Sequence, residues 1–262
     1  MKLHVLSSGS SGNSYCAETD TDMFFVDIGV STANVKKYLG SAAAGKTISL
    51  FVTHEHVDHI KGITPFINAF RPKIYTSAGT AEYLARMRNV PRELLFPLAT
   101  DVYYNMDSFA ITPFNVSHDA EEPFGCKLMT SCGNIGFLTD IGCVTQEQLT
   151  YMEDVDVLVL EANHDEHLLK KSRYPQDLKK RIASHKGHLS NNAAAAVVTA
   201  LHGGRLNHCL FAHVSEENND YRILEELGIF CKEQFGVNIS VLRQKNYTSY
   251  EVFQTVRGGS CV

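Results

Sequence analysis

The residues of this chain that could do chemistry are concentrated in one short run. Residues 53–60 read Thr-His-Glu-His-Val-Asp-His-Ile, which places three imidazoles and the carboxylate of Asp58 within six positions. A single histidine would need no explanation beyond a solvated loop or a hydrogen-bonded core position. The density of the whole run favours a metal, because histidine and aspartate are common ligands of divalent cations.

The spacing within the run predicts two metal ions. Alternate residues of an extended segment point the same way, so His54 and His56 can share one ion. Asp58 and His59 lie past the turn and can reach a second ion about 3.5–4 Å from the first. The run follows the apolar stretch at 48–52, so we expect it at the end of a β-strand.

Other polar side chains follow apolar stretches in the same way, namely His118, Asp140 and His213. A strand end holds such a side chain rigidly, and it brings together residues that are distant in the chain. The chain also repeats itself briefly, because residues 25–29 read Phe-Val-Asp-Ile-Gly and residues 138–142 read Leu-Thr-Asp-Ile-Gly. Two related half-sheets, each ending in an aspartate, would explain this echo.

Composition favours an ordinary globular protein of the cytoplasm. The chain has 262 residues, 44% of them hydrophobic and 20% charged, and no apolar run approaches the roughly 20 residues of a membrane span. Its first six residues lead into a serine-rich stretch, so we expect no secretory signal. Seven scattered cysteines without a Cys-x-x-Cys pair make a poor disulfide framework and suit a reducing compartment.

The charge pattern points to a local positive patch on an acidic protein. The formal net charge of −5 argues against a general binder of polyanions. Seven of the seventeen residues from 170 to 186 are nevertheless basic. These are Lys170, Lys171, Arg173, Lys179, Lys180, Arg181 and Lys186. With a second group at Arg86, Arg88 and Arg92, they either form solvated helix faces or permit a track for a phosphate backbone.

The periodicity predicts a mixed α/β domain spanning residues 1–262. Strands are expected at 3–6, 23–27, 49–53, 73–77, 109–117, 125–130, 136–140, 155–160, 206–213, 238–242 and 249–253. Helices are expected at about 31–40, 58–70, 79–88, 145–152, 174–185, 190–202 and 218–234. No long linker or low-complexity stretch separates two halves.

These residues, in this order and spacing, resemble the metallo-β-lactamase superfamily. The resemblance implies an αβ/βα four-layer sandwich, with two mixed β-sheets flanked by helices and a dinuclear site at one edge. It implies that His54, His56 and His118 bind the first metal. Asp58, His59 and His213 would bind the second, with Asp140 bridging the two ions. Asp27 would support a ligand imidazole and fix its tautomer.

Within that superfamily the chain is most similar to the YycJ (WalJ) group of bacterial nucleases. The strings that carry this likeness lie at residues 8–14, 117–120, 160–165, 187–191 and 213–219. The resemblance implies 5′-to-3′ exonuclease action on DNA, in repair or replication. Only about seventy residues separate Asp140 from His213, which leaves no room for the long nucleic-acid-clamping insertion of ribonuclease J relatives.

The chemistry expected of such a site is hydrolysis of a phosphodiester. Two divalent cations, zinc, manganese or iron, can bind a phosphate oxygen and ready a bridging hydroxide for in-line attack, with Asp58 among the catalytic ligands. The leaving alkoxide needs a proton, and His188, which follows a glycine at the start of the helical stretch 191–200, is well placed to supply it. Its likeness to a histidine that ribonuclease Z relatives pair with an acidic residue implies Glu161 as its orienting partner. Candidate substrate contacts are Ser11, Asn13, His164 and Lys186.

Two alternatives stay open on the sequence. A small-molecule hydrolase of the same fold, such as a cyclic-nucleotide phosphodiesterase or a thioesterase, would need no charged track, so the basic segment at 170–186 weighs toward a polymer. A metal-stabilised binding or redox module is disfavoured, because no ligand histidine is replaced and no flavin domain follows. We therefore expect a nucleic-acid substrate, DNA rather than RNA, and no membrane association; protein partners are not indicated.

Overall fold

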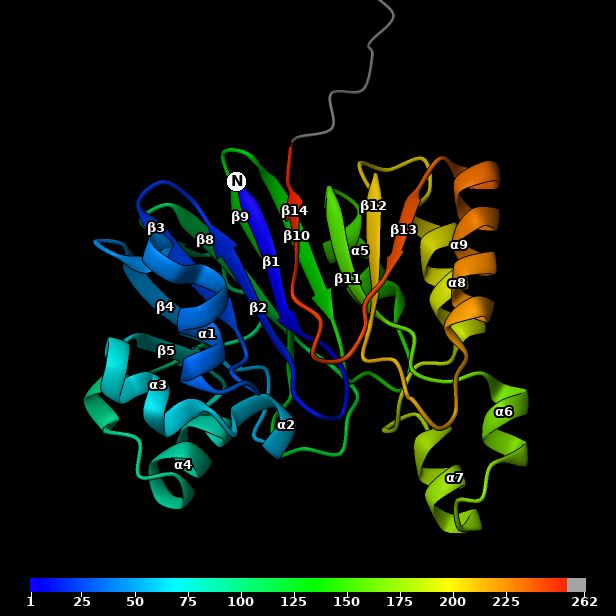
Figure 1. The fold of residues 1–262 in the computed structure, drawn as a ribbon, viewed down its shortest axis with the longest axis horizontal. Helices are drawn as coiled ribbons and strands as arrows, with labels where there is room; N and C mark the ends of the chain where they lie inside the picture. The colour runs from blue at the N-terminus through cyan, green and yellow to red at the C-terminus, as the bar shows by residue number, and fades with distance from the viewer. Residues whose placement is uncertain (254–262) are drawn as a thin grey trace, which may run out of the picture.

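Two β-sheets packed face to face form the centre of the structure (Figure 1). A computed structural model describes residues 1–253. In this part the first sheet comprises, in spatial order, β14 (Thr248–Glu251), β1 (Lys2–Ser7), β2 (Ser14–Glu18), β3 (Asp22–Val26), β4 (Thr47–Phe51), β5 (Lys73–Thr76) and β6 (Leu95–Pro97). The second comprises β13 (Asn238–Val241), β12 (His208–Ala212), β11 (Val157–Glu161), β10 (Gly133–Leu138), β9 (Phe124–Thr130), β8 (Phe109–Asn115) and β7 (Tyr104–Met106).

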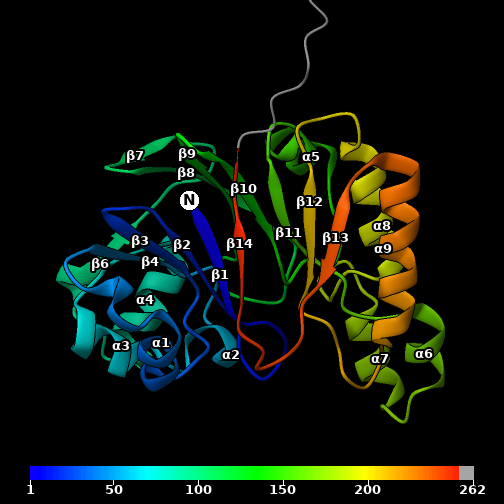
Figure 2. The ribbon, with the colours of Figure 1, turned by 45° about the horizontal axis from the view of Figure 1, so that its top comes forward.

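Helices cover the outer face of each sheet (Figure 2). The first sheet carries α1 (Thr32–Leu39), α2 (Val57–Ile60), α3 (Ile63–Phe70) and α4 (Ala78–Met87). The second carries α5 (Gln146–Met152), α8 (Asn191–Leu201) and α9 (Tyr221–Phe235), while α6 (Glu166–Lys171) and α7 (Gln176–Ile182) extend beyond its strand ends. The predicted four-layer sandwich of two mixed sheets between helices is confirmed.

Three apolar layers hold these elements together. Between the sheets, one buried apolar cluster includes Phe24 and Phe51 of the first sheet and Phe137 and Val159 of the second. Separate clusters join each sheet to its own helices. Burial of this kind contributes about 25 cal/mol per Å² of apolar surface removed from water, so the apolar faces of the strands fix the order of the layers.

The site is positioned by parallel strands that end at one edge. Strand β3 pairs in parallel with β4, and β10, β11 and β12 pair in parallel in the other sheet. Because the carboxyl ends of parallel strands meet at the same edge, the residues that follow them converge there. Asp27 follows β3, Asp140 lies two residues past β10 and His213 follows β12, while Glu161 is the last residue of β11.

Every strand expected from the sequence is present, but the prediction was wrong in places. Strands β2, β6 and β7 and helix α6 were not expected. The helix expected at 58–70 is broken into α2 and α3 at Gly62, where a Cβ would lie 1.9 Å from the Val30 carbonyl oxygen. Pro65 then lies in the first turn of α3, the part of a helix that tolerates proline.

Two further findings bear on the expected environment. No helix among residues 1–253 is long and apolar enough to cross a membrane. The six cysteines within those residues carry free thiols. That residues 1–262 form one domain stays a prediction.

Gly29 gives a test of how the strand-end loops pack. A Cβ at this position would lie 1.7 Å from the Asp58 carbonyl oxygen and 2.5 Å from the Asn13 backbone nitrogen. We expect Gly29→Ala to lower the free energy of unfolding by about 1–3 kcal/mol, as overpacking does. Denaturant titration checks this. Gly79→Ala, whose Cβ would meet the movable Glu122 side chain, should change stability little, and an equal loss in both variants would contradict the packing argument.

Candidate metal centre

The residues that follow the strands turn into the site through an unusual backbone conformation. Asp27, Asp140 and His213 have φ angles of 59°, 54° and 51°. For a residue with a side chain this left-handed region costs about 1–2 kcal/mol, so each turn needs support. The backbone nitrogen of His213 donates to Ser8 Oγ at 2.9 Å, and that of Asp27 donates to the Phe51 carbonyl at 2.8 Å.

Three histidines form a first group with converging ring nitrogens. The ligand atoms of His54, His56 and His118 lie within 4.8 Å of one another. The Nδ1 of His118 lies 3.2 Å from the Gly187 carbonyl, and that of His54 lies 3.0 Å from Thr53 Oγ1. With Nδ1 donating in these two contacts, Nε2 of His118 and of His54 keeps its lone pair. Nε2 of His54 is buried and makes no hydrogen bond within residues 1–253.

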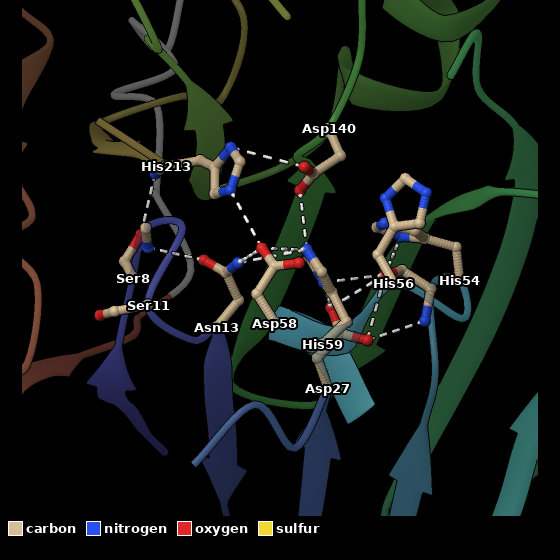
Figure 3. Close-up of polar contacts among 12 residues, drawn as sticks. Ser8, Ser11, Asn13, Asp27, His54, His56, Asp58, His59, Asp140 and His213 are labelled. Carbon is tan, nitrogen blue, oxygen red and sulfur yellow. Dashed lines mark hydrogen bonds and ion pairs between the residues drawn. The ribbon is translucent and has the colours of Figure 1, made fainter. Parts of the chain in front are cut away.

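A second group joins residues of both sheets. The ligand atoms of Asp58, His59, Asp140 and His213 also lie within 4.8 Å of one another. His59 Nδ1 donates to Asp27 Oδ2 at 2.7 Å, while its Nε2 lies 3.2 Å from Asp140 Oδ2. Figure 3 shows these side chains pointing toward a common centre from opposite sheets.

The electrostatics of the groups suit cations. Burial alone would raise the pKa of Asp140, but the imidazoles of His213 and His59 hold it well below its usual range. Burial would lower the pKa values of His59 and His213, yet Asp140 and other carboxylates raise them well above the usual range. Burial lowers the pKa of His54, which keeps this imidazole neutral.

The donor set therefore fits divalent cations. Protons on His59 and His213 balance the buried carboxylates, and cations binding the same nitrogens would displace these protons. The lone pair of His54 Nε2, which has no hydrogen-bond partner in the described chain, is a ready ligand. Paired imidazole and carboxylate donors suit zinc, manganese and iron alike.

Glu161 ties this centre to His188. The carboxylate is fully buried, and its Oε1 accepts from His188 Nδ1 at 2.7 Å and from His213 Nδ1 at 2.8 Å. Its Oε2 accepts from the backbone nitrogens of Ile141 and Leu189 at 2.8 and 3.1 Å. Burial would raise the pKa of Glu161, but His188 and His213 lower it to about 2. Glu161 was expected to pair with His188 alone, and its hydrogen bond with His213 was not expected.

Two of the expected substrate contacts lie in the serine-glycine loop. Asn13 is fully buried, and its Nδ2 donates to Asp58 Oδ2 at 3.1 Å while its Oδ1 accepts from the Gly9 nitrogen at 2.7 Å. Ser11 lies at the edge of the group, with its hydroxyl turned away from the histidines (Figure 3). The structure thus brings Asn13 to the candidate ligands and leaves Ser11 apart.

The other two lie on the side of His188. Lys186 is exposed and lines, with His118, a cavity of about 490 Å³. His164 is buried, its Nδ1 makes no hydrogen bond in the described part of the chain, and burial lowers its pKa. Substrate contact by these four residues stays a prediction.

Glu55 and Ser8 were missed by sequence reasoning. Glu55 lies between two of the histidines but points to the other side, where it accepts from the Glu121 nitrogen at 2.9 Å and Thr80 Oγ1 at 3.3 Å. It therefore ties the loop after His118 to α4. Strand alternation was the signal that could have indicated this. Nothing in the sequence singled out Ser8 as the acceptor for the His213 nitrogen.

Comparison with known sequences and structures identifies the family of this chain. The sequence model of the β-lactamase superfamily domain matches residues 40–209. The chain belongs to this superfamily, and its fold is that of metallo-β-lactamase fold proteins.

Particular relatives are more informative than the superfamily. The chain is 31% identical over 226 residues to exodeoxyribonuclease WalJ of Streptococcus pneumoniae, covering 83% of each protein. It is 30% identical to exodeoxyribonuclease YycJ of Bacillus anthracis, covering 91% of this chain and 95% of that protein. Among solved structures, the metallo-β-lactamase fold protein YhfI of Bacillus subtilis superposes with a TM-score of 0.71 at 16% identity, over 95% of this chain and 99% of that one.

Asp140 offers the sharpest test of the metal centre. We expect Asp140→Ala to lose at least one bound ion, because this carboxylate faces both His59 and His213. Metal content per chain, measured by mass spectrometry after loading with manganese or zinc, checks this. The matched variant is Asp20→Ala, at an exposed aspartate outside the cluster, which should keep the wild-type stoichiometry. Unchanged metal content in Asp140→Ala would contradict the assignment.

Proposed function

We propose that this protein is a metal-dependent phosphodiesterase, and more narrowly a 5′-to-3′ DNA exonuclease that works in the cytoplasm in DNA repair or replication. The observation that carries the proposal is the kinship, over more than four-fifths of the chain, with two proteins named exodeoxyribonucleases. We propose DNA rather than RNA as the substrate because both relatives are named exodeoxyribonucleases.

Two divalent cations, zinc, manganese or iron, would complete the proposed site. His54, His56 and His118 would hold one, and Asp58, His59 and His213 the other, with Asp140 between them. Bound cations of this kind activate water and neutralise charge on a phosphate. Asp27 and Glu161 accept hydrogen bonds from Nδ1 of His59 and His213, which would leave Nε2 of each imidazole to bind a cation.

His188 is the proposed proton donor to the leaving oxygen. Its side chain is 22% exposed and lies beside the centre, with Nδ1 bonded to Glu161. Burial would lower the pKa of His188, but the Glu161 carboxylate raises it above the usual value. The raised pKa favours the protonated imidazole, and its N–H at Nε2 is the proposed proton source.

The basic segment at 170–186 is the proposed track for the DNA backbone. The segment has seven basic residues, and two of these side chains make contacts within the protein. Arg181 pairs with Asp119, and Lys179 Nζ donates to the Lys170 carbonyl at 2.9 Å. Lys171 and Lys180 are exposed on α6 and α7, which extend from the edge where the site lies (Figure 1).

The function is tested with the purified chain and 5′-phosphorylated duplex DNA, single-stranded DNA and RNA. We expect manganese-dependent release of nucleotides that EDTA stops. His188→Ala should keep its metal content while the rate falls by about 10²–10⁴-fold, the range for a positioned proton donor. The remote His202→Ala, at the exposed end of α8, serves as the matched control and should keep full activity.

Two outcomes would count against the proposal. Loss of metal from His188→Ala would assign this residue to the ligand set instead. Failure to cleave any nucleic acid, together with hydrolysis of a cyclic nucleotide or a thioester, would identify a small-molecule hydrolase of the same fold.

The lysines are tested by charge reversal. Lys171→Glu combined with Lys180→Glu should weaken DNA binding for all sequences and reduce the slope of log K against log salt by about 1–2, since each duplex phosphate contact contributes about 0.9. Filter binding at several salt concentrations measures this. The control is charge reversal at Lys36 and Lys37, which are exposed on α1. Equal effects of the two double variants would show that the basic segment is a solvated helix face and not a DNA-binding track.

A further inference from the structure

A second cavity adjoins His188 and is not used by the site described so far. Its volume is about 210 Å³, and it lies between α7 and the strand ends. Its lining includes Ser10, Tyr174, Leu178, Arg181, His188 and Asn218. Because α7 forms its outer wall, we call it the arm pocket.

The arm pocket has a polar end and an apolar side. Asn218 is 1% exposed, and its Oδ1 makes no hydrogen bond to any residue from 1 to 253, so a donor group on an occupant would satisfy it. The lining also includes Tyr174 and Leu178, which offer an aromatic ring and an aliphatic side chain. A base and sugar combine these two kinds of surface, and bases stack readily on tyrosine.

The position of His188 determines which part of the substrate would enter the arm pocket. Hydrolysis forms a bond between water oxygen and phosphorus and breaks the bond from phosphorus to the leaving oxygen, which takes a proton. If His188 supplies that proton, the sugar bearing the leaving oxygen lies on the side of His188. The lining of the arm pocket includes His188, whereas that of the larger cavity of about 490 Å³ includes His118 and Lys186.

Residues 186–188 therefore separate two compartments of different size. In 5′-to-3′ digestion the leaving oxygen is the 3′ oxygen of the terminal nucleotide, so this nucleotide would occupy the smaller compartment. The remaining strand would pass over His118 toward Lys186. The arm pocket, at about 210 Å³, has less than half the volume of the larger cavity of about 490 Å³, so it has room for one unit. Arg181 and Asp119, which pair with each other, both line it.

We propose that the arm pocket receives the departing nucleotide as a deoxynucleoside 5′-monophosphate, with its base against Tyr174 and Leu178. This inference rests on the proposed function and names the subsite that would make the enzyme remove single nucleotides.

The first test fills the arm pocket with a larger side chain. Leu178→Trp in the full chain should weaken binding of thymidine 5′-monophosphate, measured by calorimetry with manganese present, by about tenfold or more, a stacking-sized effect. Excision from 5′-phosphorylated duplex DNA should slow by a similar factor, with metal content unchanged. Leu168→Trp, at a half-buried leucine of α6 that does not line the pocket, should leave both measurements at wild-type values.

A second variant keeps the test decisive if tryptophan disturbs α7. Leu178→Ala enlarges the pocket and should speed removal of a 5′ nucleotide with a bulky base substituent relative to an ordinary one.

Wild-type nucleotide affinity and excision in Leu178→Trp, or equal losses in Leu168→Trp, would overturn the assignment. A wild-type chain that binds the nucleotide but cleaves no phosphodiester would instead refute the proposed function, so the two failures are distinguishable.

Discussion

Buried carboxylates that hold imidazoles are the constraint on which the rest of this site depends. Asp27 and Glu161 are both fully buried, and each accepts a hydrogen bond from the Nδ1 of a candidate ligand histidine. A buried carboxylate without a positive partner destabilises the folded state. Displacement of His59 or His213 would leave Asp27 or Glu161 without this partner, so both imidazoles are held in place. The two sheets, the left-handed turns and the strand-end loops are arranged around this requirement.

The internal echo in the sequence has a structural counterpart. In each copy the aspartate, Asp27 or Asp140, has a positive φ, and the glycine two residues later lies against another loop of the site. A Cβ on Gly29 would lie 1.7 Å from the Asp58 carbonyl oxygen, and one on Gly142 would lie 2.2 Å from that of His185. One copy thus packs the loop that carries the second ligand group, and the other packs the loop that leads to His188.

Much of this arrangement could be predicted because the ends of strands can be recognised in a sequence. An apolar stretch followed by a charged residue identified Asp140 and His213, and the dense run identified residues 54–59. What could not be predicted depends on tertiary contacts. Strand β2 was missed because its buried residues follow a serine-glycine loop without a clear alternation. The second bond of Glu161 and the role of Ser8 join segments far apart in the chain, which spacing does not reveal.

The α6–α7 arm differs from the rest of the molecule in how it is held. Helix α7 has no fully buried residue, and α6 buries Leu169 alone, so little apolar burial fixes the arm to the sheets. An exposed ion pair such as Arg181 with Asp119 contributes only about 0–1 kcal/mol. Segments with few buried contacts open at low free-energy cost. The arm can therefore yield to an entering strand while the metal-ligand candidates, which are anchored to strand ends and buried carboxylates, stay in place.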